Sequence, residues 1–341
     1  MMFADEKELE RELSRPSEAL VAEAAEWQED VIVLGAGGKI GSGVATMARR
    51  ALDEAGRKEV RVQAVSRWTD REARDRLESV GVDTVVTDLS DPAAVDGLPD
   101  AGNVVFLVGA KFGTSTNSDE AWMTNTVLPA YVARRYARSR ISALSTGNVY
   151  PLTSPMTGGP VETDETGPVG EYAITCRGRE QVFTHGARTR GTRVALVRLN
   201  YACEPRYGVV ADIARRVQAG EPVDLSIGVV NVVWQRYTNE VVLRALGHAD
   251  TAPFLLNLTG PETASVRAIA TQLGEKLGVT PNFVGTEGET SLLNNAAKCH
   301  ALFGYPDRTL GQLIQLQADW IGAGGNLWNK PTKFERRDGN F

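Results

Sequence analysis

The sequence predicts an α/β fold in which a doubly wound parallel sheet is followed by a smaller mixed α/β domain. Three observations predict it. Six short apolar runs between residues 30 and 200 alternate with segments long enough to form crossover helices. These runs are almost continuously hydrophobic, as expected of strands that are buried on both faces of a sheet. A glycine-rich loop directly follows the first run, and beyond residue 200 the rhythm becomes less regular.

Length and composition exclude several classes of protein. The chain has 341 residues, enough for about two domains. Its formal net charge of −6 gives no reason to expect a nucleic-acid partner. No apolar run approaches the roughly 18 residues of a membrane helix. Three cysteines without CxxC pairing and three scattered histidines predict neither a disulfide framework nor a metal site. The charged N-terminus does not resemble a signal peptide, so we expect a cytoplasmic protein.

The elements follow in order. Residues 1–29 form a helical extension, because apolar positions among acidic residues predict two short amphipathic helices that are separated at Arg15-Pro16. We expect this extension to pack on the domain or on a neighbouring subunit. Residues 30–200 form the dinucleotide-binding domain, whose candidate strands are 31–34, 60–65, 82–86, 104–108, 141–144 and 194–199.

The second half of the chain reads as an interleaved substrate domain over residues 201–321. We expect helices at 209–219 and 263–277 and short apolar runs at 223–227, 253–258 and 280–284. Segments near 229–250 and 306–321 are expected to pack back on the first domain. The polar, glycine-rich residues 322–341 are predicted to be a tail that wraps or docks.

The glycine loop predicts a Rossmann-type dinucleotide site. Gly35, Gly38 and Gly41 stand between the first strand and the following helix, together with Lys39 and Ile40. The first glycine permits the tight turn, the second lets a pyrophosphate approach the backbone, and the third lets the helix pack closely on the strand. The phosphate loop of nucleotide triphosphatases is excluded, because Ile40 stands where that motif requires Ser or Thr.

Cofactor choice is expected at the ends of the second and third strands. Arg67 ends the second strand where an acidic residue would bind the ribose of NAD, and a guanidinium suits the 2′-phosphate of NADP. NADP is therefore the first prediction and NAD the second. After the third strand, Asp88-Leu89 is predicted to contact the adenine, although Asp88 is equally suited to cap the following turn.

Taken in order, several motifs resemble the extended short-chain dehydrogenase/reductase superfamily, in particular its NAD-dependent epimerase/dehydratase family. They are the glycine loop, Asp88-Leu89, Asn125, the run Ser145-Thr146-Gly147-Asn148-Val149-Tyr150, and Tyr172. The resemblance spans about residues 30–320. It implies hydride transfer between a nicotinamide cofactor and a sugar or sugar nucleotide, with Tyr172 as general acid/base and Thr146 bonded to the same substrate oxygen. It also implies a homodimer.

One position departs from the family's pattern. A phenol has a reference pKa near 10, so it needs a nearby cation to act as a base near neutrality. The family uses a lysine four residues after the tyrosine, where this chain has Cys176. Lys111 follows the fourth strand in a loop, with Val108, Gly109 and Ala110, that should line the cofactor crevice. We hypothesise that Lys111 replaces the missing cation; the alternative is that it is an exposed loop charge.

Substrate contacts are expected mainly from the second domain. The candidates are Asn148, Asn200, Arg206 and Gln235, of which Arg206 is suited to bind a phosphate or carboxylate. Two functions remain open. The chain is either an NAD(P)-dependent oxidoreductase or epimerase, or a catalytically inactive dinucleotide-binding sensor or scaffold. The retained Tyr172 and Thr146 favour the enzyme.

Overall fold

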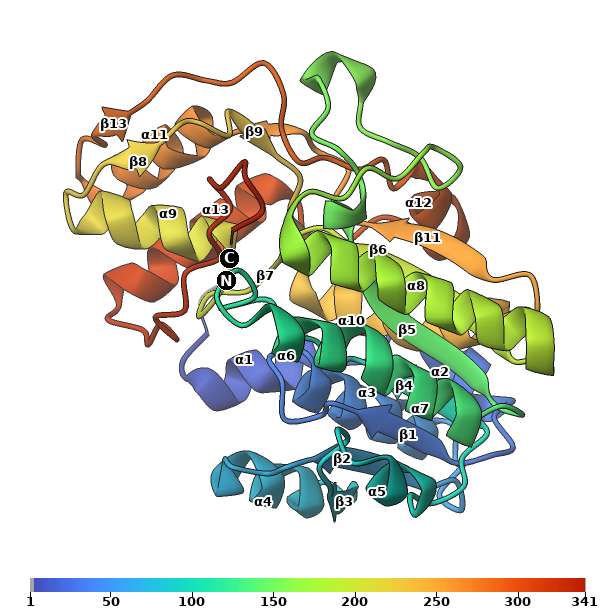
Figure 1. Ribbon diagram of the computed structural model, residues 1–341. Coiled ribbons are helices and arrows are strands. Elements are labelled where there is room, and N and C mark those ends of the chain that lie inside the picture. The colour runs from blue at the N-terminus through green and yellow to red at the C-terminus, as the bar shows by residue number, and fades with distance from the viewer. Residues whose placement is uncertain (1–2, 341) are drawn as a thin grey trace.

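A parallel seven-stranded sheet forms the centre of the molecule in a computed structural model that describes residues 3–340 (Figure 1). The strand order is β11-β6-β5-β4-β1-β2-β3. The bounds are β1 (Val31–Leu34), β2 (Val62–Ser66), β3 (Asp83–Val86), β4 (Asn103–Phe106), β5 (Arg140–Thr146), β6 (Arg193–Leu199) and β11 (Phe254–Leu258). The six predicted strands are confirmed, and the doubly wound sheet with them.

The seventh strand corrects the predicted domain division. β11 comes from the run that we assigned to the substrate domain, and it pairs in parallel with β6, Phe254 opposite Ala195. This strand extends the sheet because Leu256 and Leu258 are fully buried in the same core as β1 and β6. A short apolar run carries no sequence signal that says which sheet it joins.

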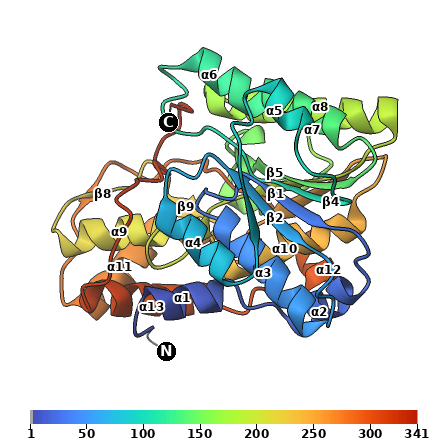
Figure 2. The same ribbon diagram turned by 90° about the horizontal axis from the view of Figure 1, so that it is seen from below.

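Helices cover both faces of the sheet (Figure 2). Alternate residues of a strand point to opposite faces, so Val33 and Val105 enter one core while Ile32 and Val104 enter the other. The first face is covered by α2 (Glu18–Ala25), α3 (Gly41–Glu54), α4 (Arg71–Ser79) and α10 (Gln235–Arg244), the second by α5 (Pro92–Asp96), α7 (Leu128–Arg135) and α8 (Gly170–Arg190). A short helix α6 (Ser118–Trp122) runs into α7 through a π-turn at Met123–Val127.

The second domain has its own hydrophobic core. α9 (Val209–Gln218), α11 (Val266–Leu277) and α13 (Leu310–Gly322) pack around Trp234 and Ile314. Short strand pairs complete it: β7 (Ala202–Cys203) with β10 (Val233–Trp234), β8 (Val223–Asp224) with β13 (Phe283–Val284), and β9 (Val229–Val230) with β12 (Ala264–Ser265). α12 (Ala297–Phe303) lies against β11.

The two segments that were expected to pack on the first domain, residues 229–250 and 306–321, differ in where they pack. Within residues 229–250, α10 packs on α3, whereas Val230, Val232 and Trp234 belong to the second core. The prediction for residues 306–321 is wrong, since α13 packs on α9 and α11. Its apolar face, which includes Leu313 and Leu316, matches the second core rather than the sheet.

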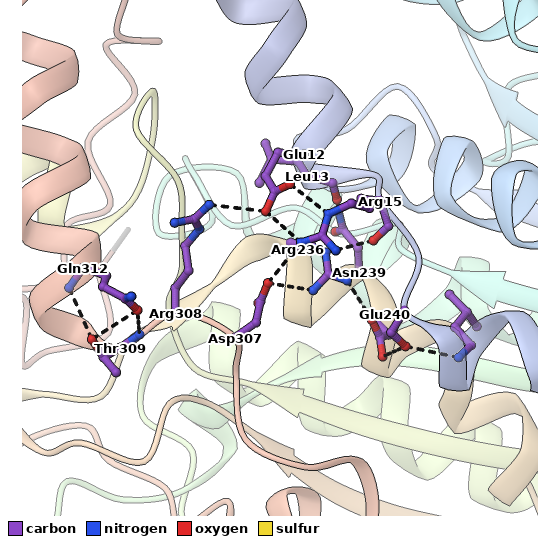
Figure 3. Close-up of polar contacts among 12 residues, drawn as sticks. Glu12, Leu13, Arg15, Arg236, Asn239, Glu240, Asp307, Arg308, Thr309 and Gln312 are labelled. Carbon is purple, nitrogen blue, oxygen red and sulfur yellow. Dashed lines mark hydrogen bonds and ion pairs between the residues drawn. The ribbon is translucent and has the colours of Figure 1, made fainter. Parts of the chain in front are cut away.

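The N-terminal extension joins the two domains. It forms the two predicted helices, α1 (Glu6–Leu13) and α2. Leu9 and Leu13 enter the core of the second domain, whereas Leu20 and Ala24 enter that of the first. Figure 3 shows the polar contacts beside them, where Arg236 of α10 reaches Asp307 and the main chain of Arg15. Within residues 3–340 no helix is long and apolar enough to cross a membrane.

Candidate active site

The glycine loop presents its backbone at the carboxyl edge of the sheet. Gly35 takes a positive φ of 88°, and its amide donates to the Val65 carbonyl, which fixes the turn after β1. A Cβ at Gly41 would lie 2.6 Å from the Gly35 carbonyl oxygen, so only glycine lets α3 begin this close to the loop. Gly37 and Gly38 remain exposed. Exposed loop amides at a helix N-terminus fit the pyrophosphate of a dinucleotide.

The residues predicted to bind the adenosine end lie beside this loop. Arg67 is exposed just beyond β2. The Asp88 carboxylate accepts hydrogen bonds from the amide and hydroxyl of Ser90, at 3.0 and 2.8 Å, and so caps the following turn. These bonds, aided by Arg67, hold the pKa of Asp88 below its usual value. Leu89 is a buried core residue.

Tyr172 and Thr146 meet where β5 ends and α8 begins. Their side chains are hydrogen-bonded, and the Thr146 hydroxyl also accepts from the side-chain amide of Asn148 at 3.0 Å. Burial raises the pKa of the Tyr172 phenol and the Cys176 thiol raises it further, while the Thr146 hydrogen bond lowers it. The fold therefore brings together three residues that the sequence singled out.

Lys111 extends into the same place from the loop after β4. Its Nζ lies 5.9 Å from the centre of the Tyr172 ring and donates to the Thr332 carbonyl at 3.0 Å. Burial lowers the pKa of Lys111 to about 8, against the opposing attraction of Asp212. In the same loop, Gly109 is exposed. Lys111 thus lies beside Tyr172 and is only partly exposed to solvent.

Lys39 turns from the glycine loop toward the second domain. Its Nζ lies 3.4 Å from the centre of the Tyr207 ring and 4.9 Å from that of Phe112. Burial lowers the pKa of Lys39 to about 7, with a smaller contribution from Lys111. Gln235 donates from its side-chain amide to the Lys39 carbonyl at 3.4 Å, so it connects α10 with the loop.

The structure corrects the prediction for Arg206. This side chain is 5% exposed and is ion-paired with Glu204, Glu6 and Glu10 at 3.0–3.2 Å. Its charge is already neutralised by three carboxylates, so it does not offer a free guanidinium to an anion. Asn200 is also internal, with 1% exposure, and donates to the Leu292 carbonyl at 3.3 Å.

A C-terminal segment, residues 328–340, crosses the site from the second domain to α8 (Figure 1). Trp328 donates to the Arg206 carbonyl at 3.0 Å. Thr332 donates to the Asp212 carboxylate from its amide at 2.7 Å and from its hydroxyl at 2.5 Å. Gly339 then lies against Gly170, two residues before Tyr172. The segment thus contacts both α9 and α8, and no local pattern in the sequence predicts the contact between Asp212 and Thr332.

Comparisons with known proteins identify the fold. No family model and no curated protein matches the sequence. Among solved structures, UDP-glucose 4-epimerase from Thermotoga maritima, crystallised with UDP-glucose, is 19% identical with a TM-score of 0.71. UDP-glucuronic acid 4-epimerase from Bacillus cereus, in complex with UDP-glucuronic acid and NAD, is 15% identical with a TM-score of 0.71. Pal from Bacillus thuringiensis is 16% identical with a TM-score of 0.73.

These likenesses extend over most of the molecule. Each alignment covers 86% of this chain and 99% of the other. At such identities a structural match defines the fold rather than the activity. The chain shares the fold of these solved structures, a parallel sheet covered by helices on both faces, as the sequence predicted.

Proposed function

We propose that this protein is an NAD(P)-dependent oxidoreductase of the epimerase/dehydratase type that acts on a sugar or sugar nucleotide. The observation that carries the proposal is the hydrogen-bonded pair Tyr172 and Thr146 at the carboxyl edge of the sheet, beside the glycine loop. Solved structures with this fold contain UDP-glucose, or UDP-glucuronic acid together with NAD. Fold alone does not carry an activity, so the paired hydroxyls are the deciding feature.

The chain's own residues fit a nicotinamide dinucleotide. Gly35, Gly38 and Gly41 would hold its pyrophosphate, because side chains at these positions would crowd the loop or its approach to the phosphates. When bound, the dinucleotide would accept hydride from the substrate and return it. Arg67 lies exposed at the adenosine end, and this supports NADP as the first choice and NAD as the second.

Three side chains perform the proton chemistry. Tyr172 takes the proton from a substrate hydroxyl, or returns it, and Thr146 orients the same oxygen by a hydrogen bond. Lys111 stabilises the ionised phenol by its positive charge. A sensor or scaffold that only binds the dinucleotide would explain the glycine loop but would not need this hydroxyl pair.

Two tests separate binding from turnover. The wild-type protein should bind NADP or NAD in a calorimetric titration, and Tyr172→Phe should bind it equally well, because the phenol lies outside the phosphate loop. With a panel of sugars and sugar nucleotides, we expect Tyr172→Phe to lose at least about 100-fold in kcat. Product stereochemistry is scored as well as cofactor absorbance, since an epimerase shows no net cofactor change. Full activity of Tyr172→Phe would refute the assigned mechanism.

We also propose that a second copy of this chain covers the outer face of α6, the π-turn and α8. Trp122, Val127 and Ile174 lie there with 41%, 38% and 38% exposure. Apolar side chains gathered on adjoining helices favour association. Sedimentation equilibrium should give twice the monomer mass, and a charged residue in place of Ile174 should shift the protein toward the monomer.

A further inference from the structure

Arg179 is a buried cation beneath the proposed catalytic pair. It stands seven residues after Tyr172 on α8, which is nearly two full turns and therefore the same face of the helix. Helical side chains tilt toward the N-terminus of their helix, so the guanidinium extends back toward Tyr172. Only 5% of the residue is exposed.

The surroundings of Arg179 contain neutral acceptors only. Its Nη1 donates to the Leu144 carbonyl at 2.7 Å, and its Nη2 donates to Asn125 Oδ1 at 2.8 Å. Its Nε has no acceptor. Among residues 3–340 no carboxylate lies within ion-pair distance of it, whereas the equally buried Arg198 of β6 is paired with Glu180 at 2.8 Å.

A buried guanidinium without a carboxylate partner destabilises the folded protein, which suggests a functional reason for its charge. A buried ion without a counterion loses its hydration, and here the two neutral acceptors and the Phe106 ring, 5.5 Å away, recover only part of that loss. The position indicates the use. A Cβ at Gly109 would lie 2.9 Å from Nη2, so the guanidinium sits directly under the loop that carries Lys111. Asn125 extends the contact, since its side chain bonds both backbone groups of Ala110 and the Thr175 hydroxyl.

We propose that Arg179 supplies from below the positive charge that Cys176 cannot supply, and that it thereby favours the ionised form of the Tyr172 phenol. The inference rests on the proposed function for its purpose, but the electrostatic effect belongs to the free protein. Arg179 does not touch the reacting atoms; it is a positioning residue that acts through Tyr172.

The charged groups around the phenol agree with this role. On α8, Arg179 lowers the pKa of Tyr172 while burial and Cys176 raise it. Burial also raises the pKa of the Cys176 thiol, which keeps that position neutral. Lys111, in the loop after β4, lies above the Tyr172 ring. In the C-terminal segment, Glu335 raises the pKa of Lys111 and Lys333 lowers it, both by less than burial does. Two cations therefore lie near the phenol, one on α8 and one in the loop after β4.

The test measures the phenol directly. A fluorinated tyrosine, whose phenol is more acidic, is incorporated at position 172, and its ionisation is followed by fluorine NMR as the pH is raised. We expect Arg179→Gln to raise the midpoint by about one pH unit or more, a tenfold or greater loss in ionisation. Arg179→Lys keeps the positive charge, so its midpoint should lie close to that of the wild type. Arg177→Gln is the matched control, because that partly exposed arginine of the same helix is already paired with Glu180 and donates to the Thr166 hydroxyl.

Each outcome decides the proposal. An unchanged midpoint in Arg179→Gln overturns it, and so does Arg179→Lys behaving like Arg179→Gln, because hydrogen bonding rather than charge would then be responsible. If Arg179→Gln does not fold, Asn125→Asp places a carboxylate beside the guanidinium; the midpoint should rise again, and no rise refutes the idea. Absence of dinucleotide binding would refute the proposed function, and leave this titration decisive for Arg179.

Discussion

Lys111 and Lys39 are positive charges that the fold partly removes from water. The pKa values of about 8 and about 7 lie well below the usual value for lysine, chiefly because of burial. Between pH 7 and 10 the unfolded chain therefore binds more protons at these positions than the folded chain does. Stability rises with pH wherever this holds. The charged form of both lysines destabilises the folded protein at neutral pH, and this destabilisation disappears as they lose their protons.

Replacing Lys111 should make this cost visible. Lys111→Met removes the buried charge and its titration. The free energy of unfolding of the wild type minus that of the variant should therefore rise by about 2 kcal/mol between pH 7 and 10. Urea denaturation at several pH values measures it, with the exposed Lys58→Met as control. A difference that falls with pH would show that Lys111 is stabilised as an ammonium ion in the folded state.

Residue roles were predictable where the contacts are local. Tyr172 and Thr146 were found because their order along the chain and their places at strand and helix ends follow a known pattern. Asn125 was found only as a member of that pattern; its bonds to both backbone groups of Ala110 come from a loop 15 residues away in sequence. Arg206 was misassigned because its partner Glu6 lies 200 positions away in sequence. No spacing rule reports such a contact.

The C-terminal segment is the element that closes the site from above. Asp212 of α9 accepts two hydrogen bonds from Thr332, whose carbonyl in turn holds Lys111. Burial raises the pKa of the Asp212 carboxyl, and the bonds from Thr332 oppose that rise. The carboxylate on one helix therefore fastens the segment over the site.

Asp212→Ala should release this fastening. Losing two bonds to a charged acceptor costs about 2 kcal/mol, so the amides of residues 332–335 should exchange with solvent at least ten times faster. Hydrogen exchange read by mass spectrometry checks this. Arg215→Ala on the same helix removes only an exposed pair with Glu221 and should leave the segment unchanged. Equal exchange in wild type and Asp212→Ala would mean that other contacts hold the segment.

Elements were predicted well where hydrophobic periodicity decides them. The six strands, α9, α11 and the two N-terminal helices were predicted to within a few residues. β11 and α13 were placed in the wrong layer, because a short apolar run or an amphipathic face tells how much surface it must bury but not against which partner.

At the scale of the whole molecule, buried ion pairs tie the N-terminal helices to both domains. Arg236 is 5% exposed and contacts Asp307 at 2.8 Å, Glu240 at 3.5 Å and the Arg15 carbonyl at 2.8 Å. These contacts come from three distant parts of the sequence, so they link the extension, α10 and the segment before α13 (Figure 3).

Arg236→Ala should weaken the whole fold. The variant loses the ion pairs with Asp307 and Glu240, but Glu240 keeps Arg244 at 3.4 Å and a hydrogen bond from Ser17. We therefore expect a loss at the lower end of the range for a broken buried pair, about 3 kcal/mol. Arg74→Ala, which breaks an exposed pair with Glu78, should cost less than about 1 kcal/mol. Chemical denaturation compares the two variants. Similar losses for both would show that the extension contributes little to stability.

The path of the C-terminal segment determines where a purification tag can be attached without disturbing the candidate site. Because Gly339 presses on Gly170, two residues before Tyr172, a bulky group attached to the C-terminal segment beside Gly339 would lie close to the reacting groups. The helix α1 lies away from α6 and α8, as the view from below shows (Figure 2). Recombinant material for every assay above should accordingly be tagged at the amino end.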